Sequence, residues 1–125
     1  MTQGEHRLNR ETRQLIEVID QLRSALLTYK RACEGMLRAA AGPGQPASDT
    51  IETMERLKVR ERRQAVTEAM DEFEAARYRV RVGLIEAAQN EGRNLSDVAR
   101  ALGVSRQLVS RLGVEADDAE RRDTR

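Results

Sequence analysis

The sequence predicts an all-α protein: a long antiparallel hairpin of coiled-coil-like helices, followed by two short helices that meet at a tight corner. Three observations support this prediction. Charged residues make up 34% of the 125 residues and aromatic residues only 2%, which is typical of long helices with charged outer faces. Apolar residues recur at helical spacing through most of the chain. Both prolines lie in one short stretch, which indicates the loop of the hairpin.

The first predicted helix covers residues 5–41, where no proline interrupts the chain. Its apolar residues alternate between intervals of four and three, which is the spacing of a coiled-coil seam. Such a seam must be buried, either within one chain or between two copies, and the sequence leaves this choice open. Ile16, Leu27 and Leu37 widen the apolar stripe, which suits more than one partner helix. The predicted dimerisation seam consists of Leu15, Ile19, Leu22, Leu26, Tyr29 and Met36.

A loop and a second helical segment follow. Residues 41–48 contain both prolines and are predicted to be the linker of the hairpin. Residues 49–91 are predicted to form one helical segment, for which Ser48 and Asp49 are available as N-caps. Most side chains of residues 55–64, "ERLKVRERRQ", are charged, and we expect this run, in which Glu55 and Glu61 alternate with basic residues, to form a solvated helix face with ion pairs four residues apart.

Two short helices joined at a tight corner are predicted for residues 95–113, "LSDVARALGVSRQLVSRLG". Ser96 is placed to cap the first helix, and Gly103 can end it in the left-handed conformation. Ser105 is placed to cap the second helix, which Gly113 is expected to stop. The positions expected to face inward are small or apolar: Val98, Ala99, Leu102, Val104, Leu108, Val109 and Leu112.

The outward side of the second short helix carries Arg106, Gln107, Ser110 and Arg111, with no acidic residue among them. These side chains donate hydrogen bonds of the kind that base edges and phosphates accept. A corner used only for packing would not require them. The pattern therefore favours contact with a nucleic acid duplex.

The stretch "LSDVARALGVSRQLVSRL" resembles the helix-turn-helix of bacterial DNA-binding proteins. The shorter "DVARALGVSRQLVSRL" is similar to the three-helix domains of resolvase-type recombinases and of sigma-factor region 4. A further helix precedes the motif in those domains, and residues 79–92 fit that position. The resemblance covers about 40 of the 125 residues and leaves no room for a recombinase catalytic domain.

The resemblance implies which side chains contact DNA. Those implied to face bases in the major groove are Arg106, Gln107 and Ser110, with Arg111 on a base or a phosphate. Those implied to meet phosphate oxygens, at helix N-termini, are Ser96 and Ser105.

Three domains are predicted on this basis. They are a helical dimerisation arm over 1–72, a helix-turn-helix DNA-binding domain over 73–113 and a disordered polar tail over 114–125. The expected function is sequence-specific binding of double-stranded DNA by a homodimeric bacterial transcriptional regulator, located in the cytoplasm on the nucleoid. The alternatives are a coiled-coil adaptor whose corner is a packing element, and a phage or mobile-element accessory factor for recombination or packaging.

Composition sets limits on other functions. The chain has one histidine, His6, and one cysteine, Cys33, so neither a metal cluster nor a catalytic triad is available. We therefore expect no enzymatic activity and no cofactor, and the short apolar runs give no membrane span. The net charge is only +1, but residues 93–112 carry four arginines and a single aspartate. DNA binding would depend on that local charge.

Overall fold

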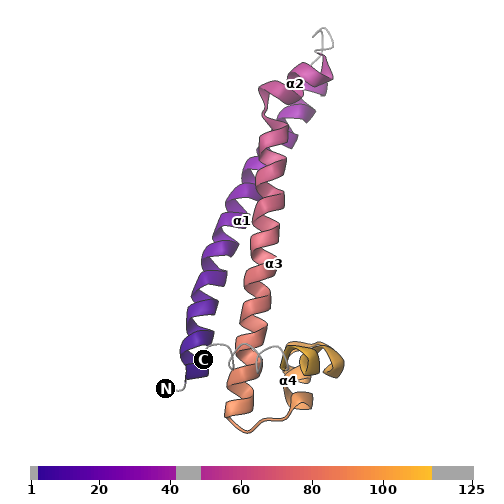
Figure 1. Ribbon diagram of the computed structural model, residues 1–125. Helices are drawn as coiled ribbons and strands as arrows, with labels where there is room; N and C mark the ends of the chain where they lie inside the picture. The colour runs from indigo at the N-terminus through magenta and orange to yellow at the C-terminus, as the bar shows by residue number, and fades with distance from the viewer. Residues whose placement is uncertain (1–2, 42–48, 114–125) are drawn as a thin grey trace. The chain divides into compact units, whose positions relative to one another are not determined.

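The computed structural model describes residues 3–41 and 49–113 (Figure 1). Within them the chain is helical and has no strand. The helices are α1 (Gln3–Ala41), α2 (Thr50–Arg56), α3 (Val59–Asn90) and α4 (Leu95–Leu102), and a further helix covers residues 106–113. The predicted all-α fold with a long helical hairpin is confirmed, and two short helices follow the hairpin in the sequence. The predicted tail and all but the first residue of the predicted linker lie outside the described residues.

Contacts divide the chain into two compact units. The corner unit consists of Met1–Ile16 and Ala75–Arg125, and the hairpin unit consists of Glu17–Glu74. Each unit therefore contains part of α1 packed against part of α3. Residues 3–16, which belong to the predicted arm, make their contacts within the corner unit.

In the hairpin unit, the buried side of α1 uses small residues. Val18 and Ala32 are buried, with exposed fractions of 4% and 0%. Gly35 lies so close to the turn after α2 that a Cβ atom there would meet Leu57 Cδ2 at 3.0 Å. Small side chains on this side let the two helices approach closely.

The predicted seam is divided between a covered and an uncovered part. Its half-buried members are Leu15, Leu22, Tyr29 and Met36. Ile19 and Leu26 are instead 43% and 47% exposed, although they belong to the same heptad pattern. The intrachain contact therefore uses one edge of a wide apolar stripe and leaves the other edge open.

The second helical segment is not continuous, so the prediction of one helix over residues 49–91 is wrong. α2 ends at Arg56 and α3 begins at Val59, with Lys58 at a φ of +54° between them. The break has a packing reason. On a continuous helix, residues two apart point in different directions. Because the turn changes the direction of the chain, Leu57 can be half-buried while Val59, two residues later, is buried. The cap by Asp49 is confirmed, since its side chain accepts a hydrogen bond from the Ile51 amide at 3.1 Å.

The corner unit has one apolar core that joins three helices. Val82 and Ile85 come from α3, Val98 and Ala99 from α4, and Val109 and Leu112 from the 106–113 helix. Ile85 and Val109 have no exposed surface. The partly buried residues around them are Ala88, Leu95, Leu102, Val104 and Leu108. The inward-facing set predicted for the corner is thereby confirmed.

Candidate nucleic-acid interface

Gly92 ends α3 and starts the turn into the corner. It has a φ of +80°, and its amide donates to the Gln89 carbonyl at 3.0 Å. The next amide, that of Arg93, donates to the Ala88 carbonyl at 3.0 Å. This pair of bonds is the Schellman arrangement, in which a left-handed residue satisfies the last helical carbonyls. The predicted end of the segment at this glycine is confirmed.

Asn94, rather than Ser96, caps α4, so the predicted cap is wrong. The Asn94 side chain accepts a hydrogen bond from the Asp97 amide at 2.8 Å. Ser96 is the second residue of the helix. The signal for the true cap was present in the sequence, because an asparagine three residues before an acidic residue is typical of a helix start.

Gly103 forms the tight turn of the corner as predicted. It has a φ of +71°, and its amide donates to the Arg100 carbonyl at 3.3 Å. The Val104 amide donates to the Ala99 carbonyl at 3.0 Å, which completes a second Schellman arrangement. Val104 is half-buried against the core, so the turn is also held by an apolar contact.

Ser105 caps the second short helix, as predicted. Its hydroxyl accepts a hydrogen bond from the Leu108 amide at 3.1 Å. Gly113, where the helix was predicted to stop, is itself helical, and the residues after it lie outside the described part of the chain. It is buried, and a Cβ atom there would lie 3.5 Å from Gln89 Nε2, an ordinary contact distance.

The outer face of the 106–113 helix carries the four side chains singled out in the sequence. Val109 and Leu112 direct the opposite face into the core, so the outward residues are all exposed: Arg106, Gln107, Ser110 and Arg111. Within the described residues, none of the four makes an ion pair or a side-chain hydrogen bond. They are therefore available to an external partner.

The two other arginines of the local basic patch are engaged. Arg93 Nε lies 3.7 Å from Asp97 Oδ2, and Arg100 Nη2 lies 3.4 Å from Asp97 Oδ1. Both arginines are exposed, so these pairs add little stability. The two pairs neutralise the charge of Asp97, the single acidic side chain among residues 93–112.

The start of α1 packs against the α3 part of the corner unit, and the sequence did not predict this contact. Leu8 packs on Gly83, where an added Cβ would meet the Leu8 Cα at 3.4 Å. Arg7 Nη1 pairs at 3.1 Å with Oε2 of Glu86, a residue only 6% exposed. Heptad spacing alone does not predict such a charged contact.

A second interhelical pair joins the same two helices. Arg79 Nε lies 3.1 Å from Glu11 Oε2. Arg79 is the middle one of three arginines in "RYRVR", residues 77–81. Its guanidinium is held by a carboxylate of the same unit.

The basic run over residues 56–63 was expected to form ion pairs four residues apart, and this expectation is wrong. Within the part of the chain that the structure describes, no ion pair involves its basic members, which are Arg56, Lys58, Arg60, Arg62 and Arg63. The turn at Lys58 separates the run into two helices and so disrupts the regular spacing that such pairs need.

Comparisons with known proteins give no match to any family model, curated protein or solved structure. None of the described helices is both long enough and apolar enough to span a bilayer. Among the described residues, no group of three His, Cys, Asp or Glu side chains is placed to hold a metal ion.

Proposed function

We propose that this protein binds double-stranded DNA in a sequence-specific manner through its helix-turn-helix, as a homodimeric transcriptional regulator. One observation supports this proposal above the others. The 106–113 helix is fixed on its inner face by Val109 and Leu112, while its outer face presents polar and cationic side chains without internal partners.

The proposed contacts follow from the position of each side chain. Arg106 and Gln107 lie in the first turn of the helix, the part that enters the major groove in helix-turn-helix complexes. Ser110 follows one turn later, and Arg111 adds a cation for a base or a phosphate. Ser105 and Ser96 lie at or near helix N-termini, where phosphate oxygens are favoured.

The proposed homodimer uses the uncovered edge of the hairpin unit. The contact between Gly35 and Leu57 sets the register of the antiparallel pair. Away from this contact, residue numbers fall along α1 and rise along α3. Met70, thirteen residues after Leu57, is therefore level with Leu22, thirteen residues before Gly35.

Helix geometry places Met70 on the same side of the hairpin as the uncovered seam residues. In an antiparallel pair, residues directly after the covered positions of both helices, here Val18, Ala25 and Ala69, point to one side. Ile19 and Leu26 on α1 and Met70 on α3 meet this condition, with exposed fractions of 43%, 47% and 52%. A second copy covering these side chains would give the dimer two recognition helices, as two-fold helix-turn-helix proteins have.

Selection of bound sites from a random duplex library tests the DNA-binding proposal. We expect an enriched sequence, and we expect Arg106→Ala to weaken its binding by about 1–3 kcal/mol and to relax the preference at one position. Arg31→Ala is the matched control, since Arg31 is an exposed arginine of the hairpin unit. Equal binding by the Arg106 variant and the wild type would remove that side chain from the interface.

A further inference from the structure

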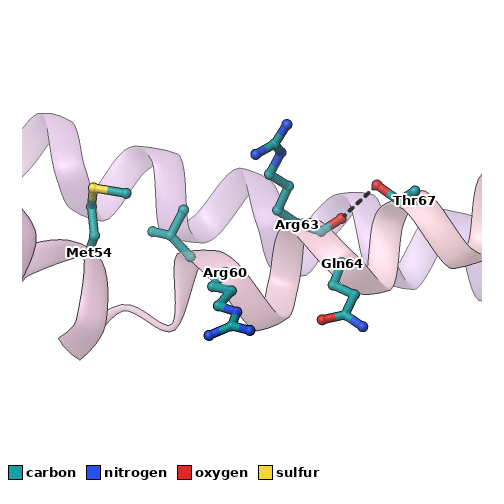
Figure 2. Close-up of a pocket in the computed structure, with 6 residues that line it drawn as sticks. Met54, Arg60, Arg63, Gln64 and Thr67 are labelled. Carbon is teal, nitrogen blue, oxygen red and sulfur yellow. Dashed lines mark hydrogen bonds between the residues drawn. The ribbon is translucent and has the colours of Figure 1, made fainter.

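An open groove of about 340 Å³ lies between α2 and the first two turns of α3 (Figure 2). Met54 and Val59 provide its apolar lining. Its polar lining follows the helical intervals of three and four that define one helix face: Arg60, Arg63, Gln64 and Thr67. In Figure 2, Arg63 extends to one side of α3, and Arg60 and Gln64 extend to the other.

A second groove of about 370 Å³ continues this surface. Met54 and Arg60 line both grooves, and the second adds Ile51 from α2. Ile51 and Met54 are 63% and 41% exposed, so the apolar surface of the groove is uncovered. Exposed large apolar side chains that line a groove indicate an interaction surface.

The turn between α2 and α3 creates this groove. Lys58 has a φ of +54°, a conformation that costs a residue with a side chain about 1–2 kcal/mol. The turn allows α2 to lie beside the first turn of α3 instead of continuing its axis. Met54 is thereby placed next to Arg60, which a continuous helix would not achieve.

The charge differs between the two grooves. The lining of the first groove has two exposed arginines, Arg60 and Arg63, and no acidic residue, whereas the second groove is also lined by Glu55 and Glu61. Neither guanidinium has an ion-pair partner within the described residues. A ligand with carboxylates could therefore form charge-assisted hydrogen bonds here without displacing an internal partner.

We propose that this groove binds an acidic amphipathic helix of a partner protein. The apolar side chains of such a helix, three and four residues apart, would contact the exposed side chains of Met54 and Ile51. Its flanking carboxylates would meet Arg60 on one side and Arg63 on the other. Helix-in-groove recognition uses this division between apolar anchors and charged edges, and the flexible thioether of Met54 adapts to different anchors.

The apolar lining favours a protein helix over a nucleic acid backbone. A phosphate backbone would leave the apolar side chains of Ile51 and Met54 uncovered. The proposal depends on residues of the hairpin unit alone, so it does not require that the helix-turn-helix bind DNA. Together with DNA binding, it would allow the regulator to recruit another protein.

Binding of two synthetic peptides to the full chain tests the proposal. The first is an amphipathic helix of about 20 residues, long enough to form in solution, with leucines on one face and glutamates at its flanks. The second has lysine in place of each glutamate. By fluorescence anisotropy we expect the acidic peptide to bind at least about ten-fold more tightly, with an affinity that falls as salt rises.

Charge reversal in the groove sharpens the test. The double variant R60E/R63E should invert the preference, so that the lysine peptide binds more tightly than the glutamate peptide. The control is R31E/R38E, which reverses two exposed arginines of α1 outside the groove. Met54→Ala should weaken binding of both peptides, because it removes apolar contact without changing the charge.

Three results would overturn the proposal. The first is equal affinity of the wild type for the two peptides. The second is loss of binding to the acidic peptide in the control R31E/R38E as well as in R60E/R63E. The third is an unchanged peptide preference in R60E/R63E together with weaker binding to a random DNA duplex, which would make the basic run a phosphate-contacting surface. Circular dichroism establishes that each variant keeps its helical content, and the Arg106→Ala variant should bind peptides as the wild type does.

Discussion

The corner unit and the hairpin unit differ in how far they bury their apolar side chains. The corner unit buries its side chains in one core that joins three helices. The hairpin unit contains seven of the nine large apolar residues that are exposed in the described chain. The difference indicates that the corner unit has a core built from its own residues, whereas the hairpin unit leaves large apolar side chains uncovered.

The largest expected effect is on the core of the corner unit. Ile85→Ala removes a side chain with no exposed surface, and we expect a loss of about 2–5 kcal/mol in the free energy of unfolding. Ile51→Ala in the hairpin unit is the control, because Ile51 is 63% exposed and should change stability by less than about 0.5 kcal/mol. Similar losses in both variants, measured by urea denaturation, would remove the contrast between the units.

The next effect concerns the surface for a second copy. Leu26→Glu should weaken self-association by at least about 2 kcal/mol, because it places an unpaired carboxylate in the proposed interface. Leu27→Glu is a closely matched control, since both leucines are 47% exposed but point in different directions on the helix. Sedimentation equilibrium measures the mass, and a dimer that withstands Leu26→Glu would contradict the proposed interface.

A smaller effect is expected at the turn of the corner. Gly103→Ala should destabilise the corner unit by about 1 kcal/mol, because Gly103 has a φ of +71° that disfavours a Cβ atom. No atom lies within 4 Å of an added Cβ there, so the cost is conformational rather than steric. Gly113→Ala is the control, and its helical position should make it neutral or slightly stabilising. Thermal unfolding that ranks the two variants in the reverse order would contradict this account.

The smallest effect separates the observed cap from the predicted one. Asn94→Ala should cost about 1 kcal/mol, because the Asp97 amide loses its acceptor. Ser96→Ala should leave stability nearly unchanged, since Ser96 lies inside α4. Because Ser96 is also proposed to meet a phosphate, its variant should weaken DNA binding without lowering the melting temperature. A stability loss at Ser96 equal to that at Asn94 would mean that the cap is shared.

The sequence predicted the corner well because its signals are local. Gly103 and Ser105 act within three or four residues of their own positions, so a short window contains both the cause and the result. The asparagine cap was missed because a serine two residues later is an equally suitable capping residue. Its hydrogen bond to Asp97 is visible only in three dimensions.

The hairpin was less predictable in detail because its contacts are distant in the sequence. Heptad spacing gives the direction of an apolar stripe but does not decide which edge of a wide stripe faces the partner helix. Val18 and Ala32 are buried, whereas the larger Ile19 is not, since small residues permit closer helix packing. The turn at Lys58 has no local signal either, because lysine rarely adopts a positive φ.

The ion pair between Arg7 and Glu86 joins residues 79 positions apart. During synthesis from the ribosome, Arg7 emerges long before its carboxylate partner exists, so the bracing contacts of the corner unit form only after the whole hairpin has been made. The same connection limits work on fragments. A piece that begins at residue 73 would lack Arg7 and Leu8, and would expose a buried carboxylate and the glycine surface beside it. Quantitative binding assays of the corner unit therefore require the first turns of α1.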